Sequence, residues 1–184
     1  MEPTMSAASG LLELAAQPGA RESGAEWYRR AGSTAADMAE RHATSPAVAA
    51  SVIAALSPQA RWSENLSAAE AVLARRPVRR ADGRFCKPVG YPANHAKARA
   101  IRDTGDTSIL SGPKVTAFRA NILGDDDYVT LDVWALRAVG IEGNPSPAQR
   151  ASTDRIYRFA AEQFGQPPAQ FQATVWCAIR GSAS

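Results

Sequence analysis

The segment from residue 110 to residue 140 reads LSGPKVTAFRANILGDDDYVTLDVWALRAVG and contains two closely spaced helix starts. Gly112 and Pro113 indicate the first start, because a helix does not need the N–H of its first residue, which proline lacks. Asp132 indicates the second, because aspartate is a preferred N-cap residue. Lys114 lies eighteen residues before Asp132. An amine and a carboxylate therefore each stand at the start of a helix, where an anion can bind beside a reactive group.

The rest of the segment agrees with two helices. Apolar residues recur at helical spacing after Lys114, and Gly124 predicts the end of that helix. Asp132 then opens a helix that ends at Gly140. A simpler interpretation is also open, in which Asp132 is only a cap and Lys114 is a solvated surface residue.

This segment resembles the helix-hairpin-helix DNA glycosylase superfamily, in particular its endonuclease III-like branch, through the pieces LSGPKVTAF and VTLDVWALR. In that superfamily a glycine-rich hairpin leads into a helix, and some members carry a lysine nucleophile there. An essential aspartate follows at this separation. An arginine comes five positions after it, as Arg137 follows Asp132 here.

Three other segments resemble the superfamily in the expected order. Residues 56–66, LSPQARWSENL, are similar to a segment that inserts a glutamine near the extruded base, which is Gln59 here. Residues 90–101, GYPANHAKARAI, are similar to its G-x-x-N-x-K-A-x-x-I helix, and residues 175–181, VWCAIRG, to its closing tryptophan-containing helix. The resemblance extends over about residues 26–181.

The sequence also departs from the superfamily pattern. Leu110 stands in place of the first hairpin glycine, and residues 102–109 are so few that the first hairpin helix must be a single turn or absent. Val133 and Trp134 replace the usual Thr-His pair, and the cysteine quartet of the iron–sulfur cluster is missing. Because of these departures, the resemblance specifies neither the substrate nor the role of Lys114.

The resemblance implies an all-α, two-lobed helix-hairpin-helix fold in a single compact domain. We expect a central lobe over about residues 46–124, with the second lobe built from residues 1–45 and 125–184. Lys114 and Asp132 would then point into one space between the lobes.

The resemblance further implies a DNA-binding enzyme that acts on a damaged or modified base swung out of the double helix. The expected reaction is cleavage of the N-glycosidic bond, in which Asp132 stabilises positive charge on the sugar or activates the nucleophile. Lys114 would either attack the sugar or hold a phosphate. The expected partner is double-stranded DNA with an extruded base, bound by a monomer that needs no metal and no cofactor.

Two alternatives stay open. An enzyme of the same fold would instead substitute groups on a hypermodified pyrimidine in DNA, displacing pyrophosphate and leaving the sugar bond intact. The other alternative is a non-catalytic DNA-binding module, although such a module has no need of a carboxylate beside a polyanion.

Several other residues are candidates for DNA contact. Gly112 would let backbone amides approach a phosphate at the start of the helix that Pro113 opens. Candidates for phosphate contacts are His95, Lys97 and Arg137, and candidates for stacking on the extruded base are Trp62, Trp134 and Tyr91. The alternatives are a core position for each aromatic residue and a solvated surface position for His95.

Residues 76–88 interrupt the helical pattern. Asp82–Gly83 is a strong turn signal for a short β-hairpin in a stretch rich in arginine. Arg79 and Arg80 would rest on DNA phosphates, where each cation adds affinity that falls with salt. A solvated loop is an equally good interpretation.

The remaining chain predicts further helices. Pro18–Gly19 indicates a break between two helices, and Gly32–Ser33 indicates a second break. Three Ser-Pro pairs indicate helix starts, at residues 45–46, 57–58 and 146–147.

Composition sets broad limits. A chain of 184 residues with 45% hydrophobic content can bury one substantial core. The net charge of +3 and the pI of about 9.1 permit DNA binding without requiring it. Cys86 and Cys177 indicate neither a metal site nor a disulfide framework. Because no signal peptide or membrane span is evident, we expect a cytoplasmic protein associated with the nucleoid or with viral DNA.

Overall fold

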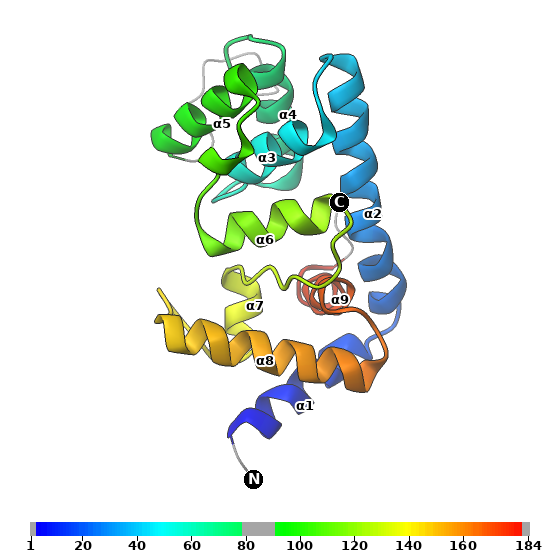
Figure 1. Ribbon diagram of the computed structural model, residues 1–184. Coiled ribbons are helices and arrows are strands. Elements are labelled where there is room, and N and C mark those ends of the chain that lie inside the picture. Colours follow the sequence, from blue (N-terminus) through cyan, green and yellow to red (C-terminus); the bar gives the residue numbers. More distant parts are fainter. Residues whose placement is uncertain (1–2, 79–90, 182–184) are drawn as a thin grey trace. The chain divides into compact units, whose positions relative to one another are not determined.

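The computed structural model describes residues 3–78 and 91–181, which form helices and no strand. The predicted all-α class is confirmed for this part of the chain (Figure 1). The β-hairpin predicted over residues 76–88 falls almost wholly outside the described residues.

The chain forms two compact units. The terminal unit consists of residues 1–30 and 124–184, and the central unit consists of residues 31–123. Helix α2, Ala20–Arg41, contributes to both units. The central unit therefore begins within α2, at residue 31, whereas the sequence predicted a start at about residue 46.

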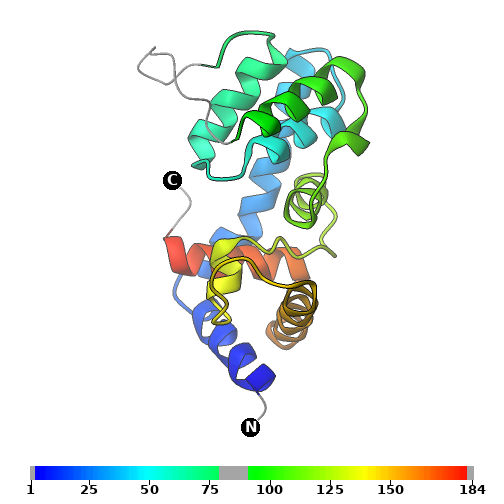
Figure 2. The ribbon, with the colours of Figure 1, turned by 90° about the vertical axis from the view of Figure 1, so that its left-hand side faces the viewer.

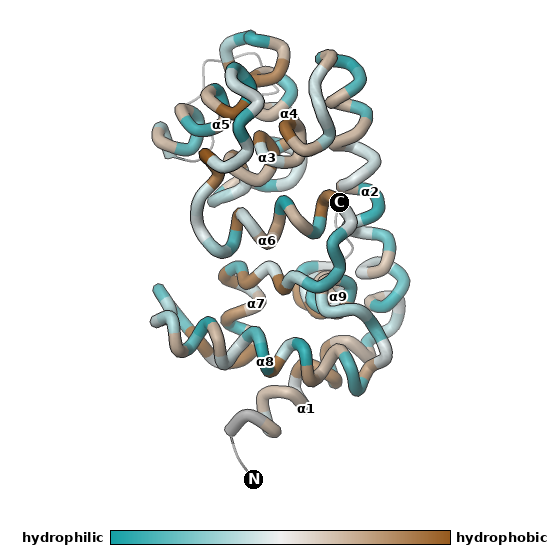
Figure 3. Tube along the Cα trace, viewed as in Figure 1, coloured by the Kyte–Doolittle hydropathy of each residue, from teal (hydrophilic) through white to brown (hydrophobic). Residues whose placement is uncertain are grey.

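Helix α3, Pro46–Leu56, is the centre of the central unit. Its residues from Val48 to Leu56 are all buried, and it packs against α4, α5 and α6 (Figures 1 and 2). The surrounding elements are α4 Trp62–Leu73, α5 Pro92–Thr104, the single 3-10 turn η1 Thr107–Ile109 and α6 Pro113–Ile122. Helix α3, which Figure 3 colours by hydropathy, has the sequence PAVAASVIAAL and contains no charged residue, so its burial removes no ionised group from water.

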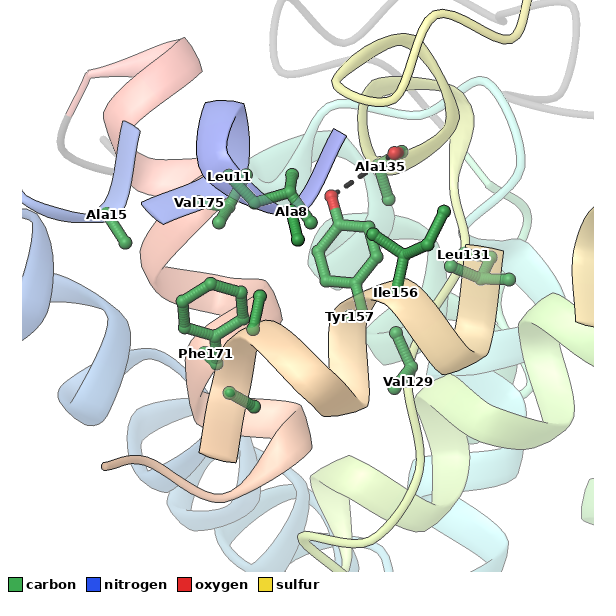
Figure 4. Packing of buried hydrophobic residues seen from close by; sticks show 12 residues of the cluster. Ala8, Leu11, Ala15, Val129, Leu131, Ala135, Ile156, Tyr157, Phe171 and Val175 are labelled. Carbon is green, nitrogen blue, oxygen red and sulfur yellow. Dashed lines mark hydrogen bonds between the residues drawn. The ribbon is translucent and has the colours of Figure 1, made fainter. Parts of the chain in front are cut away.

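The terminal unit is built on α1, α8 and α9, and the short α7 packs against α9. The bounds of these helices are α1 Pro3–Ala15, α7 Val133–Arg137, α8 Pro147–Phe164 and α9 Pro168–Arg180. Tyr157 and Phe171 are fully buried in its core, where Val129 and Leu131 also pack (Figure 4). The burial of Val129 and Leu131 fixes the backbone that leads to Asp132.

Helix α2 continues through Gly32, so the predicted break at Gly32–Ser33 is wrong. A Cβ atom on Gly32 would lie 2.8 Å from the carbonyl oxygen of Ile122, and one on Gly24 would overlap the backbone of Thr174 in α9. Both glycines therefore allow close approach of another helix.

Two of the three predicted Ser-Pro helix starts are confirmed. Ser45–Pro46 begins α3 and Ser146–Pro147 begins α8, and each serine side chain caps its helix. The start predicted at Ser57–Pro58 is wrong, because Ser57 ends α3 and α4 begins only at Trp62. The intervening residues form a turn that exposes Gln59.

Candidate nucleic-acid interface

Asp132 is the N-cap of α7, as predicted from the sequence. Its Oδ1 accepts hydrogen bonds from the backbone N–H groups of Trp134 at 3.0 Å and of Ala135 at 2.8 Å. Because one oxygen accepts both bonds, an amide at this position would keep the same cap. The Asp132 residue is half-buried.

Two buried tyrosines lie near Asp132. Burial raises the pKa of Tyr28 and Tyr157, and the negative charge of Asp132 raises both values further. Both hydroxyls therefore stay protonated and act as donors. Tyr157 donates to the carbonyl oxygen of Ala135 at 3.2 Å (Figure 4), and Tyr28 donates to Oε1 of Gln172 at 2.9 Å. The first of these bonds holds the turn of α7 that Asp132 caps.

Two arginines lie over the ring of Trp134. The guanidinium carbon of Arg137 is 5.3 Å from the ring centroid, and that of Arg180 in α9 is 5.2 Å from it. Arg180 also lies 5.5 Å from the ring centroid of Trp176, which stacks on Trp27 at 5.6 Å. The structure thus brings together two predicted site residues, Trp134 and Arg137.

Sequence reasoning missed Arg180, Trp176 and Trp27 as members of this group. The pairs Trp134–Arg137 and Trp176–Arg180 are three and four residues apart, which places each pair on one face of a helix. That spacing was the available signal for Arg180. The stack of Trp27 on Trp176 joins distant parts of the chain and has no local signal.

In the central unit, Gly112 caps α6 with a φ of 112°, and Pro113 takes the first helical position. This predicted helix start is confirmed, and the φ value lies where glycine is favoured. The half-buried Lys114 follows, and its Nζ donates to the hydroxyl of Ser57 at 3.4 Å. Before Gly112, η1 is the single turn expected for a shortened first hairpin helix.

Gln59 is exposed in the turn between α3 and α4. Its φ of 62° is in the left-handed region, and its Nε2 donates to the hydroxyl of Tyr91 at 2.8 Å. Tyr91 is 52% exposed directly before α5. A non-glycine residue in this conformation costs about 1–3 kcal/mol, and such strain is frequent at functional sites.

Lys97 in α5 donates from Nζ to the hydroxyl of Ser111 at 2.7 Å, next to Gly112. Side-chain hydrogen bonds therefore join the α3–α4 turn to Tyr91 before α5 and to α6. Another joins α5 to Ser111, two residues before α6. We call the residues that make these bonds the three-turn cluster: Ser57, Gln59, Tyr91, Lys97, Ser111 and Lys114. The cluster contains two ammonium groups and no carboxylate.

Two predicted site residues of the central unit have packing roles. Trp62 meets the ring of Phe118 edge-on, with ring centroids 6.4 Å apart. His95 is 2% exposed, so its predicted phosphate contact at the surface is wrong. His95 is buried because it shares the inner face of α5 with Ala98 and Ile101, at three-residue spacing.

Lys114 belongs to the central unit and Asp132 to the terminal unit. Each is placed within its own unit, and their convergence on one space stays a prediction. Arg79 and Arg80 lie outside the described residues. Within residues 3–78 and 91–181, no three His, Cys, Asp or Glu side chains form a group suited to a metal ion. No helix of this part of the chain has the length and apolar character needed to cross a membrane.

Residues 13–183 match the model of a protein family of unknown function, DUF7178. Because the match covers nearly the whole chain, the protein belongs to this family. Comparisons with curated proteins and with solved structures gave no match.

Proposed function

We propose that this protein is a DNA-binding enzyme that acts on a base swung out of the double helix and cleaves its N-glycosidic bond. The three-turn cluster is the observation that carries this proposal. It gathers two lysines and an exposed Gln–Tyr pair near the ends of three helices.

A DNA phosphate would bind at the start of α6. The left-handed Gly112 lets a ligand approach the backbone N–H groups of the first turn. Lys97 is tied to the residue before Gly112, and Lys114 to the neighbouring turn. An ammonium group has three donors, so each lysine can bond its serine and a phosphate together.

Gln59 would fill the space that the extruded base leaves. It projects from a tight turn, and its hydrogen bond to Tyr91 orients an otherwise flexible side chain. The left-handed backbone at Gln59 supports a functional role, because such strain is otherwise a cost to stability.

Asp132 would stabilise the positive charge that develops on the sugar as the bond breaks. Two backbone donors fix its Oδ1, and Tyr157 in turn fixes the backbone of Ala135. The carboxylate is therefore oriented before a substrate binds, which lowers the cost of reaching the reactive geometry.

A panel of DNA duplexes, each with one damaged or modified base, tests this proposal. We expect free base to be released from at least one duplex, measured by chromatography of the products. Release of pyrophosphate instead would indicate group substitution on the base. Binding without either product would leave a non-catalytic module, and absence of binding would refute the proposal.

Borohydride trapping on the best substrate then assigns the role of Lys114. We expect no covalent adduct, because in this proposal Nζ of Lys114, which is bonded to the hydroxyl of Ser57, holds a phosphate and does not attack the sugar. We also expect Lys114→Gln to weaken DNA binding. An adduct that is absent in Lys114→Gln would instead make Lys114 the nucleophile.

A further inference from the structure

The terminal unit carries two positive charges at one aromatic ring. Arg137 and Arg180 are exposed, and their guanidinium carbons lie 5.3 Å and 5.2 Å from the centroid of Trp134. Neither side chain makes a hydrogen bond or an ion pair with any residue that the structure describes, Asp132 included. Their charges are therefore not neutralised by this part of the chain.

The two like charges lie close enough to repel each other. Because both are at the same ring, their separation is on the order of a Debye length, about 10 Å at 0.1 M salt, so screening is incomplete. An exposed cation–π contact contributes only about 0.5–1 kcal/mol. A bound anion would relieve the repulsion that remains.

A guanidinium group placed over a ring keeps its hydrogen-bond donors available. A guanidinium group packs on an indole ring through its flat face, while its five N–H donors lie at the edge. Arg180 is further ordered by Trp176, which is itself stacked on Trp27. The donor edges are thus positioned in advance for a group that accepts two parallel hydrogen bonds, such as a phosphate.

We propose that Arg137 and Arg180 form a phosphodiester-binding subsite, with Trp134 and Trp176 as the platform that orients both guanidinium groups. The ligand is a DNA strand contacted through one or two of its phosphates. This inference rests on the proposed function and adds a DNA contact in the terminal unit to the one in the three-turn cluster.

The salt dependence of DNA binding tests the subsite. We compare the double variant Arg137→Gln/Arg180→Gln with wild type by fluorescence anisotropy of a labelled duplex over a salt series. Each lost phosphate contact lowers the slope of log K against log salt by about 0.9, so we expect a decrease of about 1–2. Arg150→Gln/Arg155→Gln makes the same charge change on another helix, α8, and should keep the wild-type slope.

A charge-conserving variant tests the role of the guanidinium group. Arg137→Lys/Arg180→Lys should keep the salt slope but bind DNA several-fold more weakly, because an ammonium group cannot form the bidentate contact. Circular dichroism confirms that each variant is folded. Wild-type affinity in this variant would overturn the proposed orientation of donors by the platform.

The outcomes separate the subsite from the proposed function. If Arg137→Gln/Arg180→Gln binds DNA with the affinity and the salt slope of the wild-type protein, the subsite is overturned and the proposed function stands. Absence of DNA binding by the wild-type protein overturns both. We also measure binding of both proteins to anionic phospholipid vesicles. If Arg137→Gln/Arg180→Gln loses vesicle binding that the wild-type protein shows, and keeps wild-type DNA binding, the subsite is overturned in favour of a lipid headgroup.

Discussion

At the scale of single residues, Gln59 combines backbone strain with an exposed position. The other non-glycine residues of the described chain with a left-handed φ are Ala43 and Arg75, which lie two residues after the ends of α2 and α4. Helix ends commonly adopt this conformation. Gln59 instead lies in the three-turn cluster, where the strain serves the placement of its side chain.

Replacing Gln59 with glycine should separate stability from activity. Gln59→Gly relieves the strain at φ 62°, so we expect the free energy of unfolding to rise by about 1 kcal/mol in urea titrations. Base release should fall, because no side chain remains to fill the DNA stack. Ala43→Gly, at φ 48°, is the control: it should raise the free energy of unfolding by a similar amount and leave base release unchanged. Full base release by Gln59→Gly would contradict its role.

The carboxylate of Glu70 should make stability depend on pH. Burial alone would raise the pKa of Glu70, but hydrogen bonds from Arg41 and His42 outweigh this effect and lower it below the ordinary value. The unfolded chain then binds the proton more readily, so the stabilisation is present above about pH 4.5 and is lost as the pH falls through the lowered pKa.

Glu70→Gln should therefore lower the free energy of unfolding at pH 7, by up to about 1 kcal/mol for a partly exposed pair. The difference from wild type should shrink as the pH falls through the lowered pKa of Glu70 and vanish once the carboxyl group is protonated. Glu40→Gln is the matched control, because Glu40 is exposed on α2 and makes no ion pair with a described residue. A difference that persists in acid would show that the charge of Glu70 is not its cause.

At the scale of elements, α2 depends on glycine for its packing in both units. Gly24→Ala should destabilise the protein by about 1–3 kcal/mol, because the new methyl group would overlap the backbone of Thr174. Gly10→Ala in α1 is the control: its Cβ would have no atom within 4 Å, so helix propensity alone should stabilise by about 0.5–1 kcal/mol. Thermal unfolding measures both effects. A neutral Gly24→Ala would contradict the close packing of α2 on α9.

Local signals in the sequence predicted most helix starts. The Asp132 cap and the Gly112–Pro113 start depend on neighbouring residues, and both are confirmed. Gly32 and the burial of His95 were not predicted, because each depends on packing against other helices. At the candidate site, single residues were predictable from motifs. The contact of Gln59 with Tyr91 was not, because it joins residues 32 positions apart.

At the scale of the whole molecule, the candidate residues are divided between the two units. The three-turn cluster lies in the central unit, and Asp132 with the two arginines lies in the terminal unit. Because the net charge is only +3, the proposed DNA binding depends on these local groups of cations more than on the overall charge. Under the proposed function, removal of the cations in either unit should weaken DNA binding.

The most direct test of the proposed base removal is the turnover of Asp132→Asn. Asparagine keeps the Oδ1 acceptor that caps α7 and removes the charge, so thermal stability and DNA affinity should stay near wild type. Base release should fall by about 100-fold or more, as expected when a catalytic carboxylate is lost. Asp127→Asn, an equal charge change at an exposed neighbouring position, should release base at the wild-type rate. Wild-type base release by folded Asp132→Asn would reduce Asp132 to a helix cap and contradict the account.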